Sequence, residues 1–309
     1  MSERTIEIKP AERSSAKAVI GLVATSGEGK TYSALLLALG LAGGNPAKVG
    51  LLDTENRRGS LYSDIFGSAP KDRFLIGDLT PPFSPSRYIA AMRQFAEAGI
   101  EALVIDSASH EHEGEGGLEE IAHRPKANGG ERKIADWITA KREHKRFMNT
   151  LLFLPCHVIV CFRAREKMDF RDPAKPISLG LQPVTEKNVL FEMTASFLLS
   201  EKGKRHDEIK LPECLRGILG KQGYFTEQHG ADLREWLGGG GDKLERARNS
   251  LALAASEGTG RFKEVWIGLD NSTKTALAEF KDTLKALALH ADEDKKSIIG
   301  NDGDNGAPD

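Results

Sequence analysis

The feature that most constrains the fold of this chain is a glycine-bearing turn between an apolar stretch and an apolar helix candidate. The stretch AVIGLVA, at residues 18–24, has the length and continuous hydrophobicity of a buried strand, and SALLLALGLAGG begins at Ser33. Between them lies ATSGEGKT, from Ala24 to Thr31. A buried strand that turns through glycines directly into a helix predicts an α/β protein.

The turn also has the residue types that hold a triphosphate. It fits the Walker A spacing, with Ala24 where the first glycine usually stands. Its glycines let backbone N–H groups approach phosphate oxygens closely. Lys30 would bridge the β- and γ-phosphates, and the Thr31 hydroxyl would bind Mg²⁺. We therefore predict an ATP and Mg²⁺ site, the alternative being an ordinary glycine turn. The predicted nucleotide-binding residues are Ala24, Thr25, Ser26, Gly27, Glu28, Gly29, Lys30, Thr31, Tyr32 and Asp53.

Apolar runs of strand length alternate with helix-like stretches as far as about residue 200. The candidate strands are 18–24, 48–54, 73–79, 102–107 and 157–162, with a further strand or two within 190–211. Their nearly unbroken hydrophobicity predicts burial on both faces. We predict a P-loop NTPase core with a mainly parallel sheet covered by helices.

Composition narrows the partners and the compartment. The formal charge of −2 and pI near 6.5 argue against an overall polycation, so any DNA contact must be local. The three cysteines lack Cys-x-x-Cys spacing, and neither a disulfide framework nor a thiolate zinc site is indicated. The most apolar helix candidate, at 33–44, is too short to span a bilayer. We expect a cytoplasmic protein without a membrane partner.

The run GGGG divides the chain into regions. We predict an ATPase core over 1–237, a flexible linker at 238–241 and a small helical region over 242–290. The remaining residues, 291–309, are polar and rich in Asp and Gly, and we expect a disordered acidic tail.

Acidic side chains stand where predicted strands end. Asp106 ends an apolar strand and suits the carboxylate on the magnesium side of the site; capping of the next turn is the alternative. Asp53 and Glu55 lie two residues apart at the end of the second strand, so both face the same side. Glu55 is the candidate general base, with an N-cap or surface ion pair as the alternative.

Two arginines follow the last of these strands. A guanidinium at this edge can sense a γ-phosphate through its several donors. Arg163 and Arg165 are the candidates, and a surface pairing with Glu166 or Asp169 is the alternative. The predicted catalytic set is Glu55, Lys30 and Arg163, and the predicted metal ligands are Thr31 and Asp106.

Four segments of the chain resemble, in the same order, those of phage and prophage ATP-binding proteins of the RecA-like, AAA type. They are ATSGEGKT, LLDTENRRGS, ALVIDSASHEHEGEGG and LPCHVIVCFRAREK. The likeness spans about residues 17–199 and fades after 237. It implies a RecA-like core, ATP with Mg²⁺, and a role in phage DNA recombination or replication. The water-activating glutamate of RecA-like enzymes corresponds to Glu55. Their γ-phosphate sensor is commonly a glutamine, and Arg163 occupies that position here.

The resemblance also implies a contact with single-stranded DNA. RecA-like proteins bind it through loops after the later strands, where this chain has MDFRDPAKPISLG at 168–180. Lys167, Arg171 and Lys175 would meet phosphates and Phe170 offers a stacking face, although nearby acids cancel that charge. A disordered solvent loop is the alternative.

Two further charged clusters in the sequence have structural interpretations that need no ligand. KREHKR, at 141–146, is predicted to be a solvated helix face. SHEHEGEGG, at 109–117, contains His110 and His112, but its spacing matches no standard zinc signature. We expect part of an active-site loop there, with metal binding as the alternative.

The leading hypothesis is a DNA-linked ATPase that forms a homo-oligomer, in which Arg57 or Arg58 is the candidate to reach a neighbouring site. A recombination or single-strand-binding protein is a further expected partner, and the compartment would be the host cytoplasm if a phage encodes the chain. One alternative is a P-loop small-molecule or nucleoside kinase. The other is a non-hydrolysing, ATP-gated interaction protein.

Overall fold

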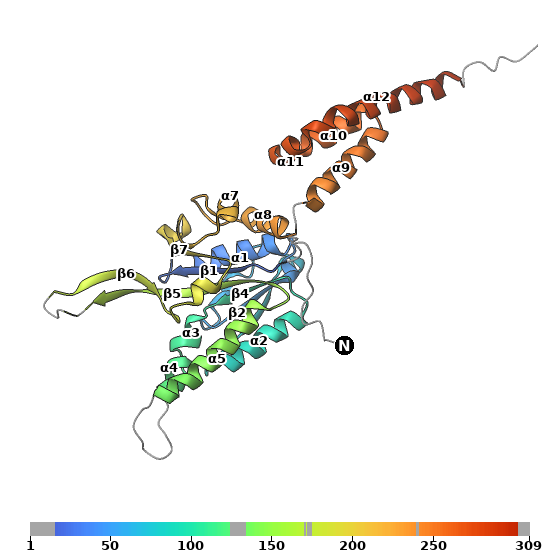
Figure 1. The fold of residues 1–309 in the computed structure, drawn as a ribbon. Coiled ribbons are helices and arrows are strands. Elements are labelled where there is room, and N and C mark those ends of the chain that lie inside the picture. The colour runs from blue at the N-terminus through green and yellow to red at the C-terminus, as the bar shows by residue number, and fades with distance from the viewer. Residues whose placement is uncertain (1–15, 124–133, 170, 172–174, 239–240, 302–309) are drawn as a thin grey trace, which may run out of the picture. The chain divides into compact units, whose positions relative to one another are not determined.

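The chain forms two compact units that divide at the tetraglycine. The computed structural model describes residues 16–123, 134–169, 171, 175–238 and 241–301 (Figure 1). One unit ends at Leu237 and the other begins at Gly238. The second unit becomes helical at Gly241, the last residue of the predicted linker. Residues 239–240 of that linker lie outside the described residues.

The first unit is built around a mostly parallel sheet. Within the described residues its strands are β1 (Val19–Ala24), β2 (Val49–Asp53), β3 (Leu75–Asp78), β4 (Ala102–Asp106), β5 (His157–Asp169), β6 (Ile177–Pro183), β7 (Ala195–Ser200) and β8 (Arg205–Lys210). The sheet order is β3-β2-β4-β5-β1-β7-β8, and β6 pairs with β5 alone. The six neighbouring strands β3, β2, β4, β5, β1 and β7 run parallel to one another, whereas β8 is antiparallel to β7. The predicted α/β class with a mainly parallel sheet is confirmed.

Helices cover both faces of this sheet. They are α1 (Lys30–Leu41), α2 (Pro85–Glu97), α3 (Ser109–Glu113), α4 (Leu118–His123), α5 (Ile134–Leu152), α6 (Val189–Glu192), α7 (Arg216–Leu219) and α8 (Glu227–Leu237). One apolar core joins the sheet to α1, α7 and α8, and a second core joins its other face to α2, α5 and α6 (Figure 1). Strands β1, β2 and β4 are buried along their whole length, as their continuous hydrophobicity predicts. The predicted strand that became β3 lies at the edge of the sheet and exposes Leu75 and Ile76.

The strand register brings the polar strand ends together. Asp53 of β2 is the partner of Asp106 of β4, and Ala24 of β1 is the partner of Arg163 of β5. Because β2, β4, β5 and β1 are consecutive in the sheet, all four residues lie at one edge. This is the edge where open α/β sheets bind ligands.

Helix α1 packs against α8 through glycines. A Cβ on Gly40 would overlap the carbonyl oxygen of Glu227, and a Cβ on Gly230 would overlap that of Leu37. The absence of side chains at both positions lets the two backbones approach closely. Since α1 begins at Lys30, this contact braces the helix that follows the glycine turn.

We expect Gly230→Ala to lower the free energy of unfolding by about 1–3 kcal/mol, because an added methyl must push two packed backbones apart. The control is Gly217→Ala in α7, where an added Cβ meets no atom within 4 Å. Thermal unfolding followed by circular dichroism measures both variants. Equal melting temperatures for the two would contradict this packing.

The second unit is a small helical assembly. Its helices are α9 (Gly241–Ser256), α10 (Thr259–Gly268), α11 (Asn271–Ala276) and α12 (Ala278–Asn301). Leu251, Ala255 and Phe262 are among the residues of its apolar core. In the described part of the chain, no helix is both long enough and apolar enough to cross a bilayer.

The segment predicted to be a disordered tail differs in the structure. Helix α12 continues through residues 291–301, and residues 302–309 lie outside the described residues. Asp292 accepts hydrogen bonds from the backbone N–H and the hydroxyl of Thr259, at 3.1 and 2.6 Å. This contact caps the start of α10 from another helix, an interaction that composition alone does not reveal.

Candidate active site

The glycine turn has the backbone geometry of an anion cradle. Gly27 and Gly29 have φ values of 83° and 78°, in the left-handed region that favours glycine. The turn leads directly into the first residue of α1, Lys30, so its N–H groups gather at a helix N-terminus. Such an end attracts negative charge through unpaired N–H groups and the helix dipole.

Lys30 extends back over the turn. Its amino group donates hydrogen bonds to the carbonyl oxygens of Ala24 and Thr25, both at 2.9 Å. The cation is therefore held beside the cradle. Ala24 and Thr25, both predicted to bind nucleotide, do not line the adjacent cavity and contribute these backbone carbonyls instead.

Thr31 and Asp106, the two predicted metal ligands, lie side by side. The Thr31 hydroxyl donates to Oδ2 of Asp106 at 2.5 Å. Burial raises the pKa of Asp106 to about 6, although the Thr31 hydrogen bond and the charge of Lys30 act in the opposite direction. A hydroxyl and a carboxylate placed side by side are a donor set that suits Mg²⁺.

Asp53 is nearly buried, with 2% of its surface exposed. Its Oδ1 accepts the backbone N–H of Glu55, and its Oδ2 accepts that of Gly59, both at 2.6 Å. The carboxylate therefore shapes the segment that carries Glu55. A direct contact between Asp53 and a nucleotide stays a prediction.

Glu55 and Arg163 face each other across the sheet edge. Arg163 donates from Nε to Oε1 of Glu55 at 2.8 Å and from Nη2 to Oε2 at 2.5 Å. Burial acts to raise the pKa of Glu55, but the hydrogen bond and the charge of Arg163 outweigh it, and the pKa lies below its usual value. The candidate base is thus ionised and held by a two-pronged ion pair.

These side chains surround one cavity of about 620 Å³. The predicted residues that line it are Ser26, Gly27, Gly29, Lys30, Thr31, Asp53, Glu55, Asp106 and Arg163. Glu28 and Tyr32 are absent from that lining. The Glu28 carboxylate instead accepts the backbone N–H of Lys202 at 2.6 Å, and Tyr32 is 47% exposed.

The cavity also contains residues that the motifs did not predict as nucleotide ligands. Arg58, Leu61 and Tyr62 line it from a short 3₁₀ helix, η2 (Arg58–Tyr62), that follows Glu55. The signal available in the sequence was their position directly after the acidic segment. Arg57 instead lies 3.3 Å from the carboxylate of Asp78.

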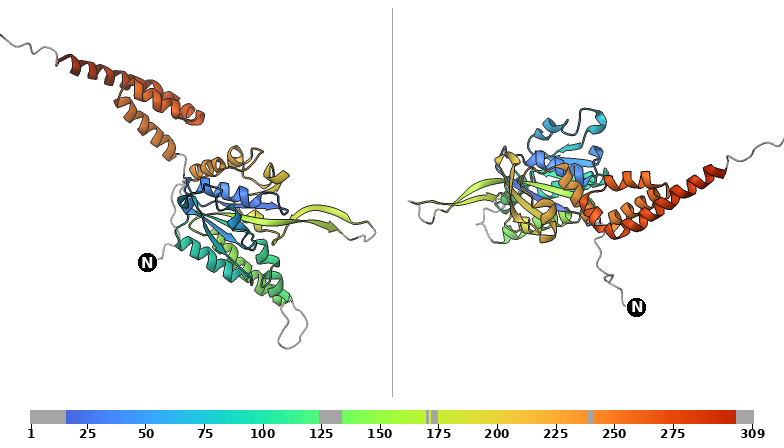
Figure 2. Two further views of the ribbon diagram at one scale, coloured as in Figure 1. Left: turned by 180° about the vertical axis from the view of Figure 1, so that it is seen from behind. Right: turned by 90° about the horizontal axis from the view of Figure 1, so that it is seen from above.

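The segment predicted to be a DNA-binding or disordered loop forms a hairpin arm. Strand β5 continues to Asp169 and pairs antiparallel with β6 (Figures 1 and 2). Arg171 is ion-paired with Asp169 at 2.7 Å, whereas Lys175 is exposed. Phe170, the predicted stacking residue, lies outside the described residues. Neither the DNA-binding loop nor the solvent loop predicted this strand pair, and the contact with DNA stays a prediction.

The two histidines after β4 have separate partners. Nδ1 of His110 lies 2.7 Å from the Thr54 hydroxyl, and Nε2 of His112 lies 3.5 Å from Oε1 of Glu119. Among the described residues, no three His, Cys, Asp or Glu side chains are grouped so that they could hold a metal ion.

The cluster at 141–146 is not a uniformly solvated face. His144 is 8% exposed, and its Nδ1 lies 3.1 and 3.2 Å from the carboxylate oxygens of buried Glu111. This pair joins α5 to α3. His144 lies on the buried side of α5, and the charged residues next to it in the sequence mask the periodicity that would have indicated this.

Comparison with known proteins places this geometry in a family. The family model described as AAA domain matches residues 16–195, more than half of the chain. A search of curated proteins finds no match. Among solved structures, a KaiC-like protein from Pyrococcus horikoshii aligns with 17% identity and a TM-score of 0.36, over 65% of this chain and 81% of that one. On the strength of the family match, the chain belongs to the AAA domain family and contains a P-loop ATPase domain.

Proposed function

We propose that this protein hydrolyses ATP with Mg²⁺ and that its activity is linked to single-stranded DNA in phage recombination or replication. The observation that carries the ATPase proposal is the convergence of Lys30, Thr31, Asp106 and Glu55 on one cavity at the carboxyl edge of the sheet. The cavity is large enough for a nucleotide, and such sites typically measure about 300–1,000 Å³.

Each of these residues has a defined task in the proposed reaction. The N–H groups of the glycine turn and Lys30 would bind the phosphate chain. Thr31 and Asp106 would hold Mg²⁺, which neutralises charge on the transferring phosphoryl group. Glu55 would orient a water molecule in line with the γ-phosphate and accept its proton.

Arg163 has two tasks in this proposal. In the described structure its guanidinium donates to both oxygens of Glu55 and lowers the pKa of the carboxylate, which makes Glu55 a weaker base toward water. A γ-phosphate is a competing bidentate acceptor for the same guanidinium. We propose that Arg163 transfers to the phosphate and thereby releases Glu55.

Removal of Arg163 should move the pH dependence of hydrolysis. In Arg163→Gln, burial would act on Glu55 without the counteracting cation, so its pKa rises. Because the base works only when ionised, the acidic limb of kcat/KM should shift to higher pH than in the wild type.

Steady-state rates across pH test this shift. Arg165→Gln is the matched control, since Arg165 lies on the same strand but pairs with Glu113. An unmoved acidic limb in Arg163→Gln would show that Arg163 does not set the protonation of the base.

The DNA link rests on the resemblance to phage RecA-like proteins and on the basic residues of the hairpin arm. The test is phosphate release by the wild-type chain with Mg²⁺ and ATP, with and without single-stranded DNA. We expect turnover that rises when DNA is added. Failure to bind any purine triphosphate in calorimetry would overturn the proposal.

The pairing of Glu55 with Arg163 also favours a second candidate, an ATP-gated interaction protein without turnover. If the guanidinium stays on Glu55 when nucleotide binds, the carboxylate remains a weak base toward water. Nucleotide binding without hydrolysis, with or without DNA, would select this candidate.

A further inference from the structure

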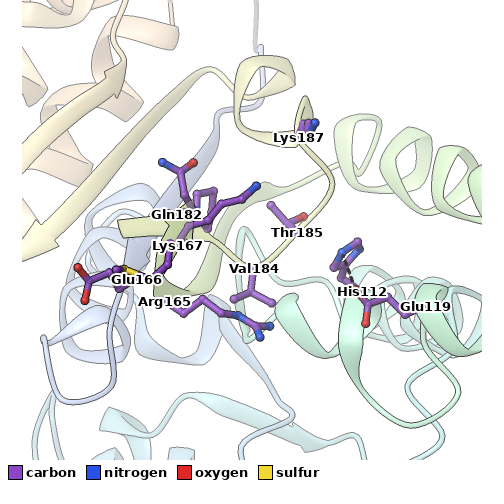
Figure 3. Close-up of a pocket in the computed structure, with 11 residues that line it drawn as sticks. His112, Glu119, Arg165, Glu166, Lys167, Gln182, Val184, Thr185 and Lys187 are labelled. Atoms are coloured by element: carbon purple, nitrogen blue, oxygen red, sulfur yellow. Dashed lines mark ion pairs between the residues drawn. The ribbon is translucent and has the colours of Figure 1, made fainter. Parts of the chain in front are cut away.

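A second cavity lies at the base of the hairpin arm, beyond the nucleotide site. It measures about 560 Å³. Strand β5 contributes Arg165 and Lys167, β6 and the following loop contribute Gln182 and Lys187, and α3 and α4 contribute His112 and Glu119. Figure 3 shows the amino group of Lys167 and the guanidinium of Arg165 directed across this space.

The charges of this cavity favour an anionic ligand. Within the described residues, Lys167 and Lys187 are exposed and neither has an ion-pair partner. The carboxylates are already engaged: Glu119 lies beside His112 at 3.5 Å, and Glu166 accepts the Ser178 hydroxyl at 2.6 Å. Figure 3 shows Glu166 directed away from Lys167.

The same strand and helix connect this cavity to the candidate active site. Arg163 binds Glu55 in the first cavity, and Arg165, two residues later on β5, is ion-paired with Glu113 at the end of α3. At the start of α3, the Ser109 hydroxyl accepts the backbone N–H of Arg163 at 2.9 Å. A ligand that draws Arg165 from Glu113 therefore acts on the strand segment that positions Arg163.

We propose that this second cavity binds phosphate groups of a single-stranded DNA backbone, with Lys167 and Lys187 as the principal contacts and Arg165 as a third. Two lysines that make no ion pair in the described part of the chain, a guanidinium and the polar groups of Thr185 and Gln182 match the repeating charge and acceptor oxygens of a phosphodiester chain. The inference rests on the proposed DNA-linked function. It places the DNA at the base of the arm, beside α3 and α4.

The test compares two double variants with the wild-type full-length chain. The first, Lys167→Ala with Lys187→Ala, removes the two unpaired cations of the cavity. The second, Lys71→Ala with Lys221→Ala, removes the same charge from exposed lysines outside the lining of both cavities. Fluorescence anisotropy with labelled oligothymidylate of about 30 nucleotides, longer than one typical binding site, measures affinity across salt concentrations.

We expect the cavity variant to bind DNA about tenfold or more weakly than the wild type. The slope of log affinity against log salt concentration should become shallower by about 1.4, because two single-strand phosphates no longer release their counterions. DNA-stimulated hydrolysis should fall with it, whereas hydrolysis without DNA should stay at the wild-type rate. The control variant should match the wild type in all three measurements. Circular dichroism confirms that both variants are folded.

Two different results would overturn the inference and are distinguishable. Equal loss of affinity in both variants, or no loss in either, would show that this cavity is not the DNA site. In that case, DNA-stimulated hydrolysis by the wild type would still support the proposed function. If the wild type neither binds the oligonucleotide nor responds to it, the DNA link itself fails together with the site, and hydrolysis without DNA then stands alone.

Discussion

Glu55→Gln should bind ATP as the wild type does and lose hydrolysis by about 10²–10⁴-fold, the usual contribution of a positioned general base. The amide keeps the size of the side chain but accepts no proton from water at neutral pH. It also loses the charge that holds Arg163, so the guanidinium becomes free to bind a γ-phosphate. Retained nucleotide affinity, no weaker than that of the wild type, with lost turnover is therefore the expected signature.

Phosphate release and titration with a fluorescent ATP analogue measure these two properties separately. Glu28→Gln is the matched control, because Glu28 lies in the glycine turn but its carboxylate contacts the Lys202 backbone rather than the cavity. Its amide oxygen can still accept that hydrogen bond. Equal hydrolysis by Glu55→Gln and the wild type would remove Glu55 from the catalytic role.

Lys30→Ala should lose nucleotide binding itself. The amino group stands beside the cradle at the start of α1, where it would pair with phosphate away from bulk water. Truncation of one partner in such a charge pair costs about 2–5 kcal/mol of binding free energy. At ATP concentrations that saturate the wild type, turnover by Lys30→Ala should disappear for the same reason.

Isothermal titration calorimetry with Mg²⁺ and ATP measures this loss. Lys48→Ala is the control, since Lys48 also donates to a backbone carbonyl, that of Gly99 at 2.8 Å, but is absent from the cavity lining. Wild-type affinity in Lys30→Ala would mean that the N–H cradle binds the triphosphate without this cation.

The sequence predicted those parts of the site that depend on strand ends. Thr31 and Asp106 stand 75 positions apart, yet each follows or ends a buried strand of one parallel sheet. Parallel strands bring their carboxyl ends to a common edge, so locating the strands was sufficient to bring these residues together. The glycine turn was readable because its conformation depends on local residue types.

Side-chain choices between several nearby partners were not predictable in this way. Arg163 had Glu166 and Asp169 close in sequence, yet it pairs with Glu55, 108 positions away. The choice depends on the sheet order, which places β2, the strand before Glu55, two strands away from β5. The hairpin arm was equally hidden, because proline and mixed charges interrupt the alternation that indicates an exposed strand pair.

The glycine contact between α1 and α8 sets a minimum length for the catalytic portion of the chain. Helix α8 spans Glu227–Leu237, well beyond the last residue of the AAA domain match at 195. Its Leu233 and Leu237 belong to the same apolar core as α1. A fragment cut at the family boundary would leave the phosphate-binding helix without its cover and present that apolar surface to water. An autonomous nucleotide-binding piece must therefore extend to the tetraglycine.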